Sequence, residues 1–79
     1  MRPTYLTQTE LTAVDLLTTR IEADLKIERT QGNRRWFTGA EIATKLAVSE
    51  KHGMIFNYAF CQLRFDRFEI DGETIRHRP

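Results

Sequence analysis

The amino-acid sequence predicts an α+β domain that is mainly α-helical, with three helices, a short strand and a C-terminal β-hairpin. Two pairs of residues spaced as T-x-x-E stand directly before apolar residues at helical spacing, which is typical of a capped helix start. A third apolar segment follows the second helix after a short turn. In the last twelve residues, Asp71-Gly72 favours a two-residue hairpin turn, because both turn positions call for positive φ.

The composition indicates one soluble globular domain over residues 1–79. With 41% apolar and 29% charged residues, the chain is too hydrophobic for intrinsic disorder. It has no run near the roughly 20 apolar residues that cross a bilayer. Its first ten residues, MRPTYLTQTE, lack the apolar core of a signal peptide. We therefore expect a cytoplasmic protein that contacts no membrane.

The first helix is predicted to begin with a capping box and to run to about Glu28. Thr7 is placed to cap the backbone amide of Glu10 while Glu10 reaches back to Thr7, and Leu6 can pack on Leu11 across this box. The apolar residues at helical spacing form one stripe that faces the core, namely Leu11, Val14, Leu17, Ile21 and Leu25.

A loop and a short strand connect the first two helices. The segment RTQGNRR, residues 29–35, has no apolar periodicity and indicates a loop, and RWFT, residues 35–38, is a strand candidate. The second helix is predicted from Gly39 to Leu46, with Ala43 and Leu46 facing inward. A second capping box and a second hydrophobic staple mark its start, formed by Thr38 with Glu41 and by Phe37 with the inward-facing Ile42.

The third helix carries apolar residues almost all round. The segment AVS, residues 47–49, is the predicted turn, and Ser49 is placed to cap this helix, which is predicted to run to about Arg64 or Asp66. A helix with two apolar sides is expected to be buried on both of them. The first stripe is Phe56, Ala59, Phe60 and Leu63, and the second, on roughly the opposite side, is Met54, Tyr58, Cys61 and Phe65.

Three explanations account for the second stripe. The hairpin and the first helix cover it, or it forms a homodimer, or it is an exposed patch that binds another protein, since aromatic residues and methionine are enriched in interface cores. Leu16 and Ile27 lie off the stripe of the first helix and are open to two interpretations. They either widen its buried face or belong to an interface with another chain.

The net charge of +1 is distributed unevenly along the chain. Residues 1–28 carry a net charge of −2, residues 29–52 carry +3, and residues 53–79 are balanced. A basic middle segment suits phosphate binding, although +3 is small beside the charge of a dedicated DNA-binding surface.

The sequence nominates no catalytic or cofactor site. Its four glycines are widely separated, so none of them builds a phosphate-binding loop. Cys61, His52 and His77 match neither the roughly four ligands of a structural zinc site nor a nucleophile and base with a supporting motif. Cys61 is interpreted as a small core or interface hydrophobe. We expect no enzyme, no cofactor, no metal and no small-molecule substrate.

The order of these elements resembles the winged helix-turn-helix family. The resemblance covers nearly the whole chain and is sharpest in EIATKLAVS, residues 41–49, where Ala43 occupies the small-residue site at which the second and third helices meet. Ala47 stands in the turn, where the family often has glycine. The resemblance implies a transcriptional regulator that binds double-stranded DNA as a dimer, with the hairpin as its wing. The small size suits a phage or plasmid regulator.

The resemblance also implies which side chains contact DNA. The start of the third helix would enter the major groove, and arginines before the second helix and after the wing would bind phosphates. The wing tip carries Asp71 and Glu73, which phosphate repels. The groove contacts are then Ser49, Lys51, His52 and Asn57, and the phosphate contacts are Arg34, Arg35, Arg76 and Arg78.

An alternative keeps the winged-helix shape and assigns it to protein binding. In this interpretation the chain is an adaptor or an inhibitor of a host protein, and the apolar face of the third helix is the interface. The near-neutral net charge and the apolar third helix favour it. Its expected anchors are Met54, Tyr58 and Phe65.

Overall fold

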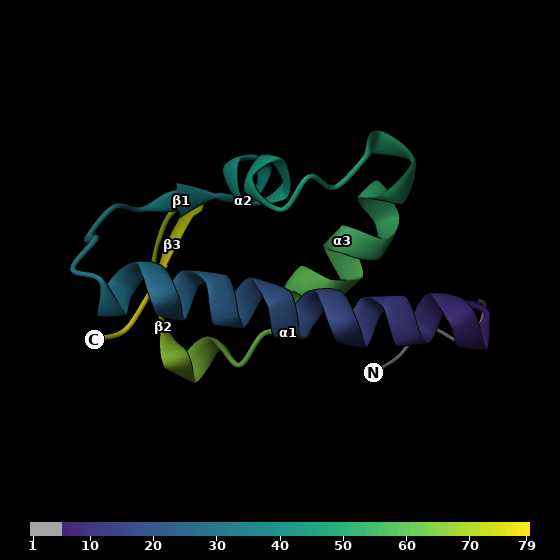
Figure 1. The fold of residues 1–79 in the computed structure, drawn as a ribbon, viewed down its shortest axis with the longest axis horizontal. Helices are drawn as coiled ribbons and strands as arrows, with labels where there is room; N and C mark the ends of the chain where they lie inside the picture. Colours follow the sequence, from purple (N-terminus) through teal and green to yellow (C-terminus); the bar gives the residue numbers. More distant parts are fainter. Residues whose placement is uncertain (1–5) are drawn as a thin grey trace.

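The computed structural model describes residues 6–79 as three α-helices, two 3₁₀ turns and a three-stranded antiparallel sheet. The predicted class, α+β and mainly α, is confirmed. Helix α1 lies along the longest axis of the molecule (Figure 1). Residues 1–5, the first half of the ten-residue N-terminal segment that lacks the apolar core of a signal peptide, lie outside the described residues. The elements are α1 (Gln8–Thr30), β1 (Phe37–Thr38), α2 (Gly39–Lys45), η1 (Glu50–His52), α3 (Gly53–Cys61), η2 (Phe65–Arg67), β2 (Phe68–Asp71) and β3 (Thr74–His77).

Helix α1 begins with the predicted capping box. The backbone N–H of Glu10 donates to Thr7 Oγ1 at 3.1 Å, and the backbone N–H of Thr7 donates to Glu10 Oε1 at 2.9 Å. The helix continues two residues beyond the predicted Glu28. Leu16 and Ile27 are 63% and 55% exposed, so of the two alternatives for these residues, that they widen the buried face is wrong. The predicted stripe is otherwise confirmed, with Val14, Leu17, Ile21 and Leu25 buried and Leu11 partly buried against them.

Helix α2 and the turn after it agree with the prediction to within one residue. Ala47 has φ 56°, the left-handed region that favours glycine, at the turn position where the winged-helix resemblance places glycine. The backbone N–H of Val48 donates to the carbonyl of Ala43 at 2.9 Å and closes this turn. At the start of α2, Thr38 and Glu41 form the predicted capping box.

Helix α3 is shorter than predicted at both ends. Ser49 makes no capping bond, because its hydroxyl is hydrogen bonded to Nδ1 of His52 at 2.8 Å, and a 3₁₀ turn precedes the helix. The helix ends at Cys61 rather than at Arg64 or Asp66. The backbone N–H of Arg64 donates to Glu22 Oε1 of α1 at 3.1 Å, so a tertiary contact replaces the next helical bond.

The C-terminal hairpin is confirmed, with its turn one residue later than predicted. Asp71 pairs with Thr74 at the end of the ladder, so the turn residues are Gly72 and Glu73. Of these residues only Gly72 has a positive φ, 61°. Strand β3 lies between β2 and β1, and Phe37 of β1 pairs with Ile75 of β3.

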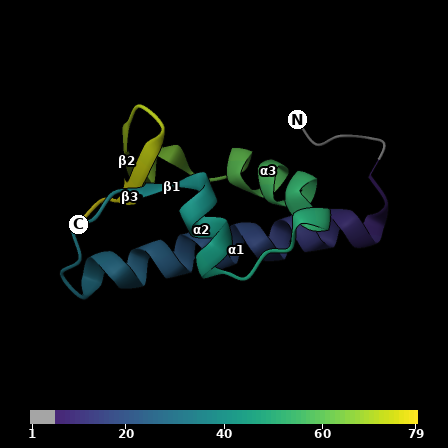
Figure 2. The ribbon, with the colours of Figure 1, turned by 90° about the horizontal axis from the view of Figure 1, so that it is seen from above.

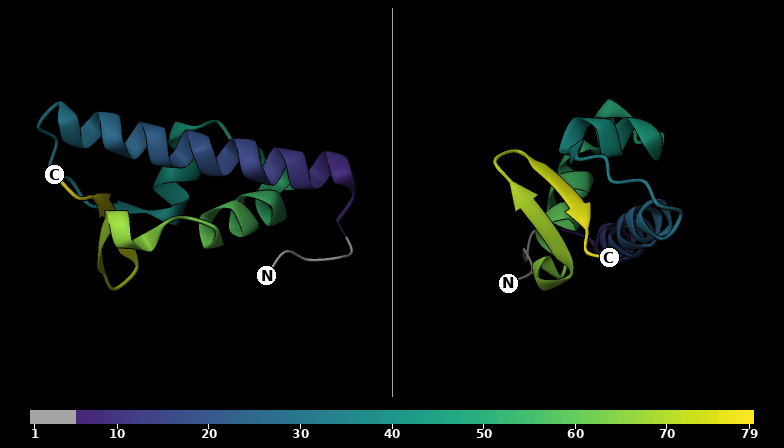
Figure 3. Two further views of the ribbon diagram at one scale, coloured as in Figure 1. Left: turned by 90° about the horizontal axis from the view of Figure 1, so that it is seen from below. Right: turned by 90° about the vertical axis from the view of Figure 1, so that its left-hand side faces the viewer.

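One core joins all these elements. Figure 2 shows α3 beside the N-terminal half of α1 and the sheet beside its C-terminal half, and both views of Figure 3 show the hairpin extending away from α1. None of the helices within residues 6–79 combines the length and apolar content needed to cross a membrane. The buried core consists of Leu6, Val14, Leu17, Ile21, Leu25, Phe37, Ile42, Phe56, Ala59, Leu63, Phe68 and Ile75.

The two stripes of α3 have different environments. The first stripe belongs to the core, with Phe60 only partly buried. In the second stripe, Met54 is 52% exposed, Phe65 is 39% exposed and Cys61 is exposed. Only Tyr58 of this stripe is partly buried against the core, so the explanation in which the hairpin and α1 cover the whole stripe is wrong, and so is a core position for Cys61.

Candidate protein-binding groove

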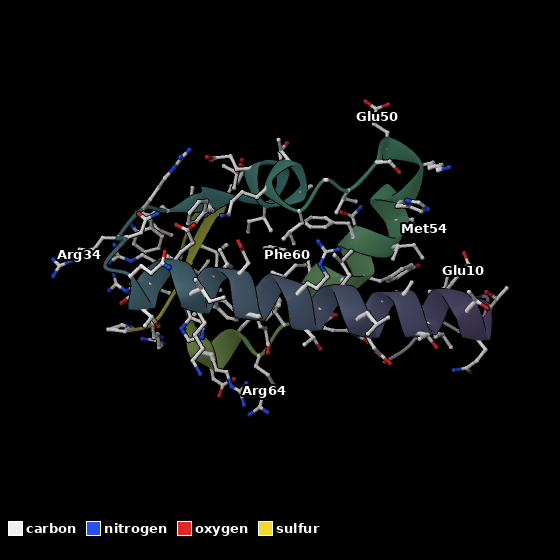
Figure 4. The ribbon with its side chains drawn as sticks, in the orientation of Figure 1. Glu10, Arg34, Glu50, Met54, Phe60 and Arg64 are labelled. Carbon is white, nitrogen blue, oxygen red and sulfur yellow. The ribbon has the colours of Figure 1, made fainter. Side chains whose placement is uncertain are left out.

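The structure does not gather the side chains predicted to contact DNA. Arg34 and Arg35 belong to the loop before β1, near one end of the long axis, whereas Ser49, Lys51 and His52 lie at η1 toward the other end. Figure 4 shows this separation through Arg34 and Glu50, which is the neighbour of Lys51. The predicted phosphate contacts and groove contacts are thus split between two regions of the molecule.

The guanidinium of Arg76, predicted to contact phosphate, already has several partners within the chain. Its guanidinium lies 4.2 Å from the centroid of the Trp36 ring. Nη1 donates to the carbonyl of Arg34 at 2.8 Å, and Nε forms an ion pair with Glu69. The Arg76 hydrogen bond holds the pKa of Glu69 below its ordinary value. The side chain of Arg76 is only 22% exposed.

Other members of the predicted DNA-binding set also have partners within the chain. Arg35 forms an ion pair with Glu41. Nε of Arg78 donates to the carbonyl of Asp66 at 3.1 Å. Ser49 and His52 are hydrogen bonded to each other. Within residues 6–79, the side chains of this set that make no hydrogen bond or ion pair are Arg34, Lys51 and Asn57, all of them exposed.

The anchors predicted for protein binding are separated as well. Met54 faces α1, and Tyr58 is partly buried against the core. Phe65 lines a small cleft of about 120 Å³ between the end of α3 and the hairpin, together with the exposed Ile70. Glu73, also at this cleft, makes the hairpin side acidic.

A larger apolar groove lies between the N-terminal half of α1 and the chain from Leu46 to Ile55. We call it the α1–η1 groove. It is open and has a volume of about 750 Å³. Figure 4 shows Met54 of α3 above the first turns of α1, where Glu10 lies. The groove is lined by Thr9, Glu10, Ala13, Leu16, Leu17, Arg20, Leu46, Ala47, Val48, Ser49, Lys51, His52, Met54 and Ile55.

The turn after α2 and the 3₁₀ turn together create this groove. The left-handed Ala47 redirects the chain after α2, and η1 delays the start of α3, so Lys51 and His52 reach the groove rim. Nη2 of Arg20 is 3.4 Å from the carbonyl of Leu46, which links α1 to the end of α2. Leu16, four residues before Arg20 on α1, lines the same groove.

The rim of the α1–η1 groove is mainly basic. Arg20 and Lys51 contribute positive charges, and His52 lies beside them. Glu10 is the acidic residue of the lining, and its carboxylate accepts the backbone N–H of Thr7, which lowers its pKa. Glu10 is hydrogen bonded at the start of its own helix and keeps its negative charge, so the rim carries the cations of Arg20 and Lys51 beside one carboxylate.

Sequence reasoning missed most of this groove. Met54 was predicted as a protein anchor, and Leu16 was noted as an apolar residue off the core stripe. Arg20 and Val48 carried no signal of their own, because the groove joins segments about 30 residues apart in the chain. The apolar Met54 and the off-stripe position of Leu16 were the local indications of protein binding.

No metal centre accompanies the groove. Within residues 6–79, no three His, Cys, Asp or Glu side chains are grouped so that they could hold a metal ion.

Comparison of the chain with protein-family models, with curated proteins and with solved structures found no match.

Proposed function

We propose that this chain is a winged-helix domain that binds another protein in the α1–η1 groove. The order helix, strand, helix, helix, hairpin supports the winged-helix assignment, as does the sheet order β1-β3-β2. The positive φ of Ala47 at the turn between α2 and α3 agrees with it. Because one fold serves many functions, the groove rather than the fold indicates what this chain binds.

The observation that carries the proposal is that two exposed aliphatic side chains share one groove. Leu16 is 63% exposed and Met54 is 52% exposed, and both line the same apolar depression. Covering each of them would contribute about 1 kcal/mol, since roughly half of each side chain is still in contact with water. Exposed apolar side chains gathered beside polar rims are typical of protein interfaces.

Binding to DNA is the second candidate. It is favoured by the exposed Lys51 in η1 and Asn57 in the middle of α3, the helix that the winged-helix resemblance assigns to the major groove. It is disfavoured by Arg35 and Arg76, which already have partners in the free protein. The acidic hairpin tip also disfavours it.

Site-specific photo-crosslinking in an extract of the source cells tests the proposal. A benzoylphenylalanine in place of Leu16 should give one discrete adduct, identified by mass spectrometry. The matched control replaces Ile27, which lies on the same helix with similar exposure but outside the groove. The adduct should disappear when Met54→Asp is added.

The crosslinking pattern distinguishes the competing interpretations. Equal adducts at positions 16 and 27 would contradict the groove as a specific site. An adduct with the mass of two copies of the chain would indicate a homodimer instead. A crosslink to DNA, or affinity for duplex DNA that falls steeply with salt and is lost in Lys51→Glu, would favour the second candidate.

A further inference from the structure

The shape of the α1–η1 groove restricts which kind of protein segment it accepts. The groove follows α1 from Thr9 to Arg20, a length of roughly 17 Å at the helical rise per residue. A segment that lies along it therefore contacts α1 over about three helical turns. Short peptide segments bind proteins mainly as added strands, as polyproline helices or as amphipathic α-helices.

The groove lining excludes the first two of these modes. An added strand needs an exposed sheet edge, and no residue of β1, β2 or β3 lines the groove. A polyproline segment needs an aromatic-lined groove, and none of the lining residues is Phe, Tyr or Trp. An amphipathic helix needs an apolar floor that accepts residues at i, i+3 or i+4, and i+7. Leu16, Val48 and Met54 are among the residues that supply such a floor.

The rim determines the charge of the helix that fits. Arg20 and Lys51 make no ion pair within residues 6–79, and Arg20 uses only Nη2 for the carbonyl of Leu46, so both can pair with an incoming acid. Glu10 is bonded to its own helix start, and the exposed Glu50 lies beside Lys51 without lining the groove. An apolar floor also gives a nucleic acid backbone little to contact, whereas an amphipathic helix covers floor and rim together.

We propose that the partner segment is an amphipathic α-helix with acidic flanks, seated along α1 with its apolar face on Leu16 and Met54 and its carboxylates on Arg20 and Lys51. This inference rests on the proposed function and names the partner of the same groove. The acidic flanks guide the helix to the rim, and the apolar contacts hold it there.

Two synthetic 16-residue peptides test this inference against the full chain. Both carry leucine at alternating spacings of three and four residues. One has glutamate and alanine at the remaining positions, and the other has lysine and alanine. Each is labelled with fluorescein and titrated by fluorescence anisotropy, and circular dichroism establishes that the two have equal helicity. The acidic peptide should bind at least ten-fold more tightly than the basic one.

Variants then assign the binding to the groove. Leu16→Ala combined with Met54→Ala should weaken binding of the acidic peptide at least ten-fold, whereas Ile27→Ala should leave it unchanged. Arg20→Glu combined with Lys51→Glu should reverse the preference between the two peptides. Unchanged circular dichroism and urea midpoints would show that the variants remain folded.

Several results would overturn the inference. These are equal affinity for the two peptides, binding of neither, and a fluorescein-labelled mixed-sequence DNA duplex that binds more tightly than the acidic peptide. If neither peptide binds while the crosslink at position 16 persists, the acidic-helix partner is wrong and the proposed function stands. If the crosslink is also absent, both fail.

Discussion

The two ends of the molecule differ in how their charged side chains are paired. The sheet end holds the C-terminal half of α1, α2 and the sheet. There Lys45 forms ion pairs with Asp24 at 3.2 Å and Glu28 at 3.0 Å. At the groove end, which holds the N-terminal half of α1, η1 and the start of α3, Lys51 and Arg20 have no ionic partner within residues 6–79. The ion pairs between described residues include no side chain that lines the groove.

This contrast indicates which charges serve the fold and which are available to a partner. A guanidinium already held by a ring, a carbonyl and a carboxylate, as in Arg76, must lose those contacts before it binds anything else. A lysine with no partner gives up only its hydration, as in Lys51. Leu16 and Met54, unlike the exposed Ile27 and Ile70, share one groove with cations that have no ionic partner within residues 6–79. We therefore expect a partner to bind at the groove end, and we expect the paired charges of the sheet end to stabilise the fold.

The largest expected difference between the two ends comes from one large-to-small substitution at each. Phe68 is 1% exposed, so Phe68→Ala should lower the free energy of unfolding by about 3–5 kcal/mol. That is a large share of the roughly 4–12 kcal/mol expected for a chain of this length. Met54→Ala should change it by less than about 0.5 kcal/mol. Urea unfolding measures both. A cost above about 2 kcal/mol for Met54→Ala would place Met54 in the core.

A second pair of variants compares a paired cation with an unpaired one. Arg76→Met removes the contact with Trp36 and the hydrogen bond to the Arg34 carbonyl, and should cost about 1–2 kcal/mol. Lys51→Met should leave the urea midpoint unchanged. Equal losses in the two variants would contradict the division between the ends.

A third pair compares two residues that the sequence predicts as helix caps. Thr38→Ala removes the hydroxyl oxygen that accepts a hydrogen bond from the backbone N–H of Glu41 at 3.1 Å, and should cost about 1 kcal/mol. Ser49→Ala should cost a few tenths of that or nothing, because Ser49 caps no backbone N–H. Thermal unfolding followed by circular dichroism distinguishes the two. If Ser49→Ala costs as much as Thr38→Ala, Ser49 does cap the helix in solution.

The smallest expected effect is the pH dependence that Glu28 contributes at the sheet end. Hydrogen bonds from Lys45 and then Asn33 hold the pKa of Glu28 below its ordinary value of 4.5. The stabilisation from Glu28 is therefore present above pH 4.5 and is lost as the pH falls through its lowered pKa. The pKa of Lys45 is raised above 10.5, chiefly by Glu28, so its contribution is lost only as the pH rises through that higher value.

Urea midpoints of the unmodified protein and of Glu28→Gln, measured between pH 2 and pH 7, test this dependence. The two midpoints should differ most near pH 7 and converge in acid. Glu50→Gln at the groove end should leave the urea midpoint at pH 7 unchanged, because Glu50 has no ionic partner within residues 6–79. A difference for Glu28→Gln that stays constant with pH would mean that its shape, rather than its charge, matters.

Much of the fold follows from contacts three or four residues apart. Both capping boxes and the buried stripe of α1 formed as predicted, because a helix start is satisfied within its own first turn and a stripe needs only helical periodicity. The hairpin formed for a similar local reason, although the ladder moved the turn from Asp71-Gly72 to Gly72-Glu73.

The candidate site was less predictable, because its residues depend on distant partners. Arg76 was predicted to bind phosphate, and its actual environment depends on Trp36 and on the carbonyl of Arg34, 42 residues away in the chain. Leu16 and Met54 were noted separately, and only the packing of α3 against α1 puts them in one groove.

The sequence by itself determined where the helices α1 and α2 begin, which face of α1 is buried, and that the chain closes with a hairpin. Each of these rests on neighbours within one helical turn or across one tight turn. The tertiary structure decided where α3 ends, through the bond from Arg64 to Glu22, and which arginines are already paired. It also decided that a groove exists, because a groove is the space left between segments that pack only when the whole chain has folded.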